Sequence, residues 1–296
     1  ELYSTSGRKL ISLDATKSLS IMHTGYKSAV IGEKGERNLP LLQRQVEQEP
    51  DNNAAWGYLA ESLAGAGQIT QARQAAEDVL DGGSKGLSQE RQGELYALWL
   101  TLAGDETPDV RLTLSGKAYQ YYSQFSGMGI LNPDVEFAMS NYLAQVGLEE
   151  DSVRMYEQAF EKLEHWQDGA SLRLTGGIQR GCNYLAVYYL KNGQTRQAVS
   201  YLTLSLRMDH NQDDALTILL GLFKEDANTT AEQVYSFLNG IYQFDDATIG
   251  LKERLFVLKA AIAKDYQELA ALIRQGMSEE QQNWLYTKEK RPWMLD

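Results

Sequence analysis

The sequence has few of the residues on which catalytic and metal sites are usually built. Its 296 residues include one cysteine and three histidines. The single cysteine, Cys182, excludes an internal disulfide framework and a cysteine-rich metal centre. His23, His165 and His210 are far apart in the sequence, which leaves little for a histidine-based metal centre. We therefore expect no metal and no cofactor bound to this chain.

Positive charge is also scarce, with 28 lysines and arginines against 40 aspartates and glutamates and a formal net charge of −12. Nucleic acids and anionic membranes attract basic surfaces, so this balance argues against both as partners. No apolar run reaches the roughly 18 residues that a membrane span needs. The first residues show no basic leader followed by an apolar stretch, so we expect a cytoplasmic location. Because the sequence does not begin with methionine, we also expect it to be part of a longer protein.

Proline is rare too, with five in the chain, and strand patterns are confined to the first residues. Residues 9–14 and 18–23 alternate apolar and polar side chains, which predicts two short strands. Two strands alone cannot bury a face, so they must pack on the helices that follow or on a partner. From about residue 33 the apolar spacing becomes helical. We expect helices over residues 34–48, 53–65, 69–81, 88–103, 108–125, 133–146, 149–165, 177–192, 195–208, 213–225, 230–241, 246–263, 265–275 and 278–287.

A repeated spacing of small residues runs through the helical part. With Asn53 as position 1 of a unit of about 34 residues, alanines stand at positions 8 and 20 and a glycine at position 15. The small residues let two helices approach closely, and the glycine ends the first helix without a φ penalty. The register recurs from Gln179 and, more loosely, from Pro133. It selects Ala60, Gly67 and Ala72, then Ala186, Gly193 and Ala198, and finally Ser140, Gly147 and Ser152.

This spacing resembles the tetratricopeptide repeat, a helix–turn–helix unit. The resemblance implies an all-α fold in which about six or seven helical hairpins stack as a right-handed superhelix. Each hairpin would bury its apolar face only against its neighbours. We therefore expect residues 33–296 to form a single tetratricopeptide-like array, preceded by a short two-strand segment.

Enzyme signatures are missing from the helical part. The sequence contains no phosphate-binding loop motif, nucleophile elbow, zinc-protease motif or paired-cysteine motif. The glycine-rich residues 176–181 follow no predicted strand, so we interpret them as a flexible linker between repeats. Asn211 or Asp213 is expected to cap a helix rather than to bind a metal with His210. Cys182 stands at a packing position and is expected to be an inert core thiol. We thus predict no catalytic residue.

The concave surface of a tetratricopeptide array comes from positions 2, 5, 9 and 12 of the first helix of each hairpin. Carried over to this sequence, these positions include Asn141, Arg180 and Asn183, which are candidates to hydrogen-bond an extended peptide backbone. Phe137 and Val187 would supply apolar contact beside them. The alternative at this point is a merely solvated inner face, because helical repeats also bind through edges and insertions.

A second resemblance is carried by residues 21–52, which hold a His-x-Gly-Tyr motif at His23, a Lys- and Arg-containing helix with paired leucines, and a Glu-Pro-Asp turn. They resemble the junction in bacterial family 2 glycosyltransferases that carry tetratricopeptide repeats. The resemblance implies that residues 1–32 are the remnant of the end of a preceding catalytic domain. The parent enzyme would use a nucleotide sugar and a divalent metal. The family's Asp-x-Asp motif has no counterpart in this chain, and His23 either contributes to the parent's active site or caps a loop.

The sequence thus favours a non-catalytic scaffold beside a glycosyltransferase whose catalytic domain is absent from this chain. Its expected partner is a protein or peptide, with a glycosyl acceptor as one candidate. Two alternatives stay open. The repeats would either brace or dimerise the enzyme, which would make the protein an oligomer, or belong to a stand-alone peptide-binding or regulatory repeat protein.

Overall fold

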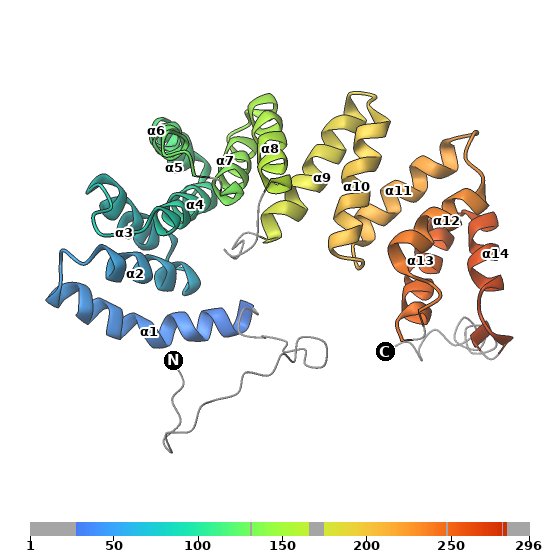
Figure 1. The fold of residues 1–296 in the computed structure, drawn as a ribbon, viewed down its shortest axis with the longest axis horizontal. Helices are drawn as coiled ribbons and strands as arrows, with labels where there is room; N and C mark the ends of the chain where they lie inside the picture. Colours follow the sequence, from blue (N-terminus) through green and yellow to red (C-terminus); the bar gives the residue numbers. More distant parts are fainter. Residues whose placement is uncertain (1–27, 131, 166–174, 247, 280, 283–296) are drawn as a thin grey trace, which may run out of the picture. The chain divides into compact units, whose positions relative to one another are not determined.

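The computed structural model describes residues 28–130, 132–165, 175–246, 248–279 and 281–282. Within these residues the regular elements are fourteen helices, and no strand is present (Figure 1). The all-α class predicted from the sequence is confirmed. The strands predicted over 9–14 and 18–23 lie outside the described residues.

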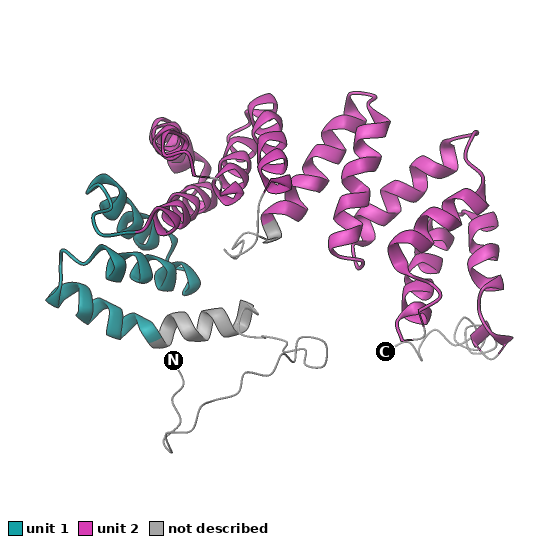
Figure 2. Cartoon of the chain, in the orientation of Figure 1, with its two compact units in different colours: residues 1–87 teal, residues 88–296 magenta. Residues whose placement is uncertain are grey.

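The chain divides into two compact units, residues 1–87 and 88–296 (Figure 2), where the sequence predicts one array over 33–296. The division follows the loop that leaves the third helix. Gly83, Ser84 and Gly86 of this loop have φ values of +79°, +51° and +79°. The Ser84 N–H donates to the Val79 carbonyl at 3.0 Å, which is a six-to-one bond that closes α3 after the left-handed Gly83. The chain then continues through the left-handed Ser84 and Gly86 before the next helix begins.

Three helices make up the described part of the first unit. Helix α1 begins at Ser28, upstream of the predicted start at residue 34, and α2 begins after Asn52, whose side chain accepts a hydrogen bond from the Ala55 N–H at 3.1 Å. Such a cap satisfies one of the donors that a helix start leaves open. The bounds are α1 (Ser28–Gln48), α2 (Asn53–Gly65) and α3 (Ile69–Asp81).

The α2–α3 hairpin uses the small residues that the repeat spacing predicts. Ala60 and Ala72 are fully buried, so the two helices approach closely at this point. Gly67 has a φ of +75°, and the Gln68 N–H donates to the Leu63 carbonyl at 2.9 Å. This left-handed end with a six-to-one hydrogen bond closes α2 and directs the chain into α3.

The second unit contains eleven helices among its described residues. They are α4 (Gln89–Asp105), α5 (Pro108–Thr113), α6 (Ser115–Gly127), α7 (Pro133–Gln145), α8 (Glu149–Glu164), α9 (Thr175–Lys191), α10 (Thr195–Met208), α11 (Asp213–Glu225), α12 (Ala231–Tyr242), α13 (Gly250–Ala263) and α14 (Gln267–Gln275). Most bounds agree with the predicted ranges to within a few residues.

The α7–α8 and α9–α10 hairpins repeat the design of α2–α3. Their small pairs, Ser140 with Ser152 and Ala186 with Ala198, are fully buried. Ser152 Oγ donates to the Ser140 carbonyl at 2.9 Å, so the serine pair leaves no unsatisfied hydroxyl at this contact. The turns again contain left-handed glycines, with φ of +83° after α7 and +71° after α9. The small residues and glycines selected by the sequence spacing thus have the expected packing roles.

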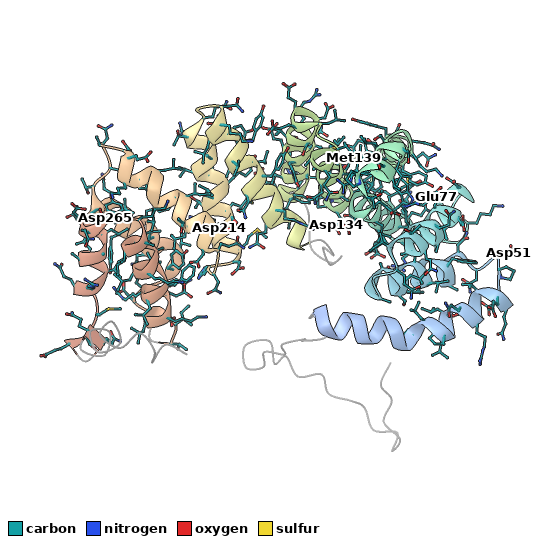
Figure 3. The ribbon with its side chains drawn as sticks, turned by 180° about the vertical axis from the view of Figure 1, so that it is seen from behind. Asp51, Glu77, Asp134, Met139, Asp214 and Asp265 are labelled. Atoms are coloured by element: carbon teal, nitrogen blue, oxygen red, sulfur yellow. The ribbon has the colours of Figure 1, made fainter. Side chains whose placement is uncertain are left out.

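The turn between α13 and α14 keeps this geometry without a glycine. Asp265 occupies the left-handed position with a φ of +50° (Figure 3). Its N–H donates to the Ile262 carbonyl and the Tyr266 N–H to the Ala261 carbonyl, both at 2.9 Å. The backbone hydrogen bonds of the hairpin turn therefore persist where the sequence motif is lost.

The helix predicted over 108–125 is divided at Leu114 into α5 and α6. In an unbroken helix the Ser115 N–H would donate to the Arg111 carbonyl. That carbonyl instead accepts from the Tyr142 hydroxyl at 2.6 Å and from the Leu114 N–H at 3.1 Å. A side chain of α7 thus takes the acceptor that would continue the helix.

The prediction of a flexible linker over residues 176–181 is wrong, because these residues form the first turns of α9. Gly181 is buried and lies close to side chains of α8. A Cβ at this position would lie 2.9 Å from ring atoms of Tyr156, closer than real contacts allow. The glycine is therefore needed for close helix packing, not for a loop.

Candidate functional site

Phe137 does not lie on an accessible surface. It was expected to supply apolar contact to a ligand, but its side chain is fully buried. Its ring centroid lies 5.2 Å from that of Phe160 in an edge-to-face arrangement and 6.3 Å from that of Tyr156. Phe137 therefore belongs to the core between α7 and α8, and its predicted binding role is corrected.

Asn141 lies four residues further along α7 and is partly exposed. Its side-chain carbonyl oxygen accepts a hydrogen bond from the Tyr156 hydroxyl of α8 at 2.6 Å. Burial raises the pKa of Tyr156, so this hydroxyl stays protonated and acts as the donor. The amide nitrogen of Asn141 is then on the other side of the group, and it has no hydrogen-bond partner among the described residues.

Arg180 is exposed near the start of α9. Partial desolvation raises the pKa of Asp105, at the end of α4, and the positive charges of Arg180 and Arg111 oppose that increase. Arg180 likewise opposes the upward pKa shift of Tyr156. The predicted residues Asn141 and Arg180 are thus brought into one neighbourhood, with Tyr156 linked to both.

Asn183, one turn further along α9, is tied into its own hairpin and the next helix. Its side-chain carbonyl oxygen accepts from Ser205 Oγ of α10 at 3.1 Å. Its amide nitrogen donates to Gln212 Oε1, just before α11, over a long 3.5 Å. Val187 follows Asn183 by one turn and is 42% exposed. We call Asn141, Arg180, Asn183 and Val187 the α7–α9 face.

The sequence did not single out Tyr156, Ser205 and Gln212 as partners of this face. Tyr156 and Ser205 lie on the second helix of each hairpin, whereas only first-helix positions were considered. The hydrogen bonds from a hydroxyl to an asparagine could not be predicted from a fixed sequence spacing. The two residues are 15 positions apart in one pair and 22 positions apart in the other. A search for an asparagine on the first helix of a hairpin, with a hydroxyl-bearing residue on the second helix, would have identified these pairs.

The turn before α11 is held by a different residue from those predicted. Asn211 or Asp213 was expected to cap the helix, but the residue before α11 is Gln212, which makes no side-chain capping bond. Asp209 instead accepts the Asn211 N–H at 2.9 Å and Gln212 Nε2 at 3.3 Å. The carboxylate thus organises the turn ahead of the helix, and the predicted capping residues are wrong.

Cys182 and His210 are the described residues that the sequence raised as a possible nucleophile and a possible metal ligand. Burial raises the pKa of the Cys182 thiol to about 12, so Cys182 is a protonated core thiol, as predicted. His210 Nδ1 lies 3.2 Å from Glu253 Oε2. No group of three or more histidine, cysteine, aspartate or glutamate side chains in this part of the chain is placed to hold a metal ion.

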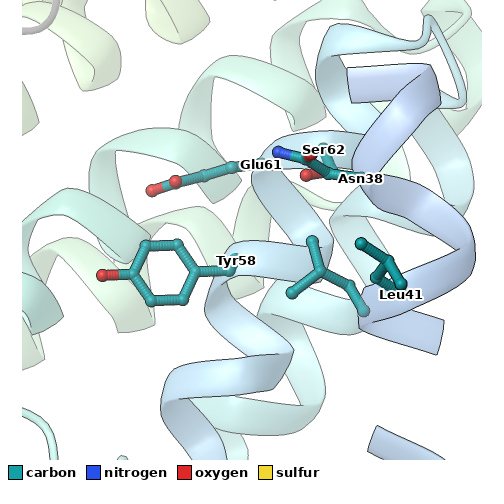
Figure 4. A pocket seen from close by; sticks show the side chains of 6 residues that line it. Asn38, Leu41, Tyr58, Glu61 and Ser62 are labelled. Atoms are coloured by element: carbon teal, nitrogen blue, oxygen red, sulfur yellow. The ribbon is translucent and has the colours of Figure 1, made fainter. Parts of the chain in front are cut away.

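The first unit carries a cleft between α1 and α2 with a volume of about 320 Å³ (Figure 4). Two of its side chains, Leu41 and Tyr58, are large, apolar and 67% and 52% exposed. Figure 4 shows the side chains of Tyr58 and Glu61 extending from α2 in the same direction. The lining consists of Asn38, Leu41, Leu42, Tyr58, Glu61 and Ser62.

No family model matches the chain, and no curated protein matches it in sequence. Among the described helices, none combines the length and the apolar character that crossing a bilayer requires.

Proposed function

We propose that the chain is a non-catalytic helical-repeat scaffold that binds a protein or peptide along the α7–α9 face. One observation carries the proposal. In two successive hairpins, an asparagine carbonyl on the first helix accepts a hydrogen bond from a hydroxyl on the second: Asn141 from Tyr156, and Asn183 from Ser205. Each carboxamide is thereby oriented before any ligand arrives, which reduces the entropy lost on binding.

The chemistry of this face fits an extended peptide. Oriented amide nitrogens donate to backbone carbonyls, Arg180 supplies a positive charge, and the exposed methyl groups of Val187 supply apolar contact. These groups suit recognition of main chain with limited side-chain selectivity. We place the face on the concave side of a right-handed superhelix of tetratricopeptide-like hairpins.

The test compares two asparagine variants by affinity capture from the native cell extract. The double variant Asn141→Ala with Asn183→Ala should lose partners that the unaltered protein retains. The matched control is Asn192→Ala, because the exposed Asn192 follows the end of α9 and, among the described residues, its amide nitrogen donates only to the Tyr188 carbonyl of that helix. Equal capture by both variants, with unchanged circular dichroism, contradicts binding through this face.

We further propose that this scaffold belongs to a bacterial family 2 glycosyltransferase. Support comes from the junction resemblance, of which the Glu-Pro-Asp turn lies within the described residues. There the Trp56 indole N–H donates to the Pro50 carbonyl at 3.0 Å, which joins the turn to α2. A nucleotide sugar and a divalent metal would then be bound by the parent's catalytic domain. A coding sequence that lacks an Asp-x-Asp-containing domain upstream of Glu1 would refute this parentage and favour a stand-alone repeat protein.

A further inference from the structure

The sequence contains two Asn–Gly pairs, Asn192–Gly193 and Asn239–Gly240, and the fold places them in different surroundings. An asparagine that precedes glycine is prone to lose its side-chain amide. The glycine has no Cβ to hinder its main-chain nitrogen from attacking the asparagine side chain. Asn192 follows the end of α9 in the turn to α10, whereas Asn239 lies inside α12. The chain therefore offers the same local sequence twice, at a helix end and within a helix.

The turn at Asn192 is held by the hydrogen bonds of a helix end. The Asn192 N–H and Nδ2 both donate to the Tyr188 carbonyl, at 3.2 and 2.9 Å. The Gly193 N–H donates to the Leu190 carbonyl at 3.1 Å. Residues 191–197 are all exposed, and a Cβ at Gly193 would meet nothing within 4 Å. Opening this turn at Asn192 and Gly193 therefore requires no core side chain to move.

Asn239 is held at both atoms of its carboxamide. Its Oδ1 accepts the Phe244 N–H at 2.8 Å, and its Nδ2 donates to Asp245 Oδ2 at 3.3 Å. Its neighbours in α12 include the buried Leu238 and Ile241. Freeing this carboxamide and the next main-chain nitrogen therefore breaks helix hydrogen bonds and disturbs the core of α11–α14.

We propose that Asn192 is a site of spontaneous deamidation, whereas the folded chain protects Asn239. When the turn opens and the Gly193 N–H loses its proton to hydroxide, the main-chain nitrogen attacks Cγ of Asn192. A bond from this nitrogen to Cγ forms, the bond from Cγ to Nδ2 breaks, and Nδ2 leaves as ammonia after taking a proton from water. Water then opens the resulting five-membered imide at either of its carbonyl carbons, which yields aspartate or isoaspartate. The reaction consumes only water and involves no residue of the α7–α9 face.

Either product weakens the turn between α9 and α10. A carboxylate at position 192 lies at the C-terminal end of α9, where the helix dipole disfavours negative charge, and it no longer donates to the Tyr188 carbonyl. Isoaspartate also adds a carbon to the main chain beside Gln194. The Gln194 N–H closes α9 by donating to the Tyr189 carbonyl at 2.8 Å. The amide hydrogens of this turn should therefore exchange faster after the reaction.

The test follows both asparagines in the full chain, folded in buffer and unfolded in urea, at mildly alkaline pH in heavy-oxygen water. Each imide that is hydrolysed takes up a heavy oxygen, which mass spectrometry locates after digestion with chymotrypsin. In the folded chain, conversion at Asn192 should be at least roughly tenfold faster than at Asn239, and in urea the two rates should approach each other. Equal rates in the folded chain would overturn the proposal, and so would an Asn192 that stays intact while the unfolded chain is converted.

Two variants test the consequence for the turn. Asn192→Gln keeps an amide but would have to form a larger ring, so conversion at this position should be lost. Asn239→Gln should leave conversion at Asn192 unchanged. After the same incubation, hydrogen exchange at residues 189–198 should accelerate in the unaltered protein and in Asn239→Gln, but not in Asn192→Gln. Acceleration in all three proteins, or in none of them despite conversion at Asn192, would contradict the proposed weakening.

Discussion

The contacts that join α7 to α8 differ in kind from the contacts that join helices α11 to α14. Buried polar groups connect α7 to α8: the fully buried Glu136 pairs with Lys162, and Ser152 donates to the Ser140 carbonyl. The core of α11–α14 consists mainly of aliphatic and aromatic side chains, although the buried Arg254 also donates to the Phe244 carbonyl, the Tyr235 hydroxyl and the Asp245 carboxylate. Its fully buried members include Leu216, Leu219, Leu220, Leu238, Val257, Leu269 and Ile273.

This difference has a physical consequence for specificity. A hydrogen bond or ion pair is satisfied only when particular residues face each other, so the polar contacts define the alignment of α7 against α8. Apolar packing depends mainly on volume and tolerates several solutions. The α7–α9 face, whose proposed function needs oriented side chains, includes Asn141, which lies next to Ser140.

The largest expected effect tests the apolar side of this comparison. Leu219→Ala should lower the free energy of unfolding by about 3 kcal/mol, because it removes buried methyl groups and leaves a cavity. In a repeat array each hairpin contacts mainly its neighbours, so the loss should be local. Hydrogen exchange should accelerate in residues 213–275 and change little in α7. Equal acceleration in α7 would show that the second unit unfolds as one body.

The polar side is tested by Lys162→Met, which leaves the Glu136 carboxylate buried without its cation. We expect a loss of about 2 kcal/mol near neutral pH. Burial raises the pKa of Glu136 above its ordinary value of 4.5, and Lys162 opposes that increase. Without Lys162 the pKa rises further.

The sign of the pH dependence follows from this shift. A carboxyl whose pKa is higher in the folded chain favours folding when protonated, and that contribution is lost as the pH rises through the folded pKa. The loss caused by Lys162→Met should therefore be smaller near pH 5 than near pH 7. Urea unfolding at both pH values measures it. The double variant Glu136→Gln with Lys162→Met should recover most of the stability, and a loss independent of pH would contradict the ion-pair explanation.

The sequence predicted the contacts that depend on residue size and spacing. Ala186, Ala198 and Gly193 could be placed because close packing and a left-handed turn each restrict the residue type. Gly181 was misread as loop-forming because the ring that excludes a side chain there, Tyr156, belongs to another helix. Glycine in a sequence does not distinguish a turn from a close helix contact.

The candidate site was predicted only in part for a similar reason. Asn141 was found from its helix position, but its hydrogen bond to Tyr156 depends on how α8 is rotated against α7. Phe137 was assigned to the surface because the repeat pattern of a regular array was applied to it, and the aromatic side chains of α8 cover it instead. The break at Leu114 likewise depends on Tyr142, a contact between residues far apart in sequence.

The smallest expected effect compares one buried tyrosine from each region. The Tyr156 hydroxyl donates to Asn141, whereas the Tyr242 hydroxyl is buried and makes no hydrogen bond to the other described residues. Tyr156→Phe should lower the free energy of unfolding by about 1 kcal/mol, because it removes a made hydrogen bond. Tyr242→Phe should leave the free energy of unfolding unchanged or raise it by up to about 1 kcal/mol. The variant removes a hydroxyl that loses its hydrogen bonds to water on folding and gains none from the other described residues. Thermal and urea unfolding of the two variants measure both changes. A loss of stability on Tyr242→Phe equal to that on Tyr156→Phe would mean that the Tyr242 hydroxyl also makes a stabilising contact, and the contrast between the two tyrosines would fail.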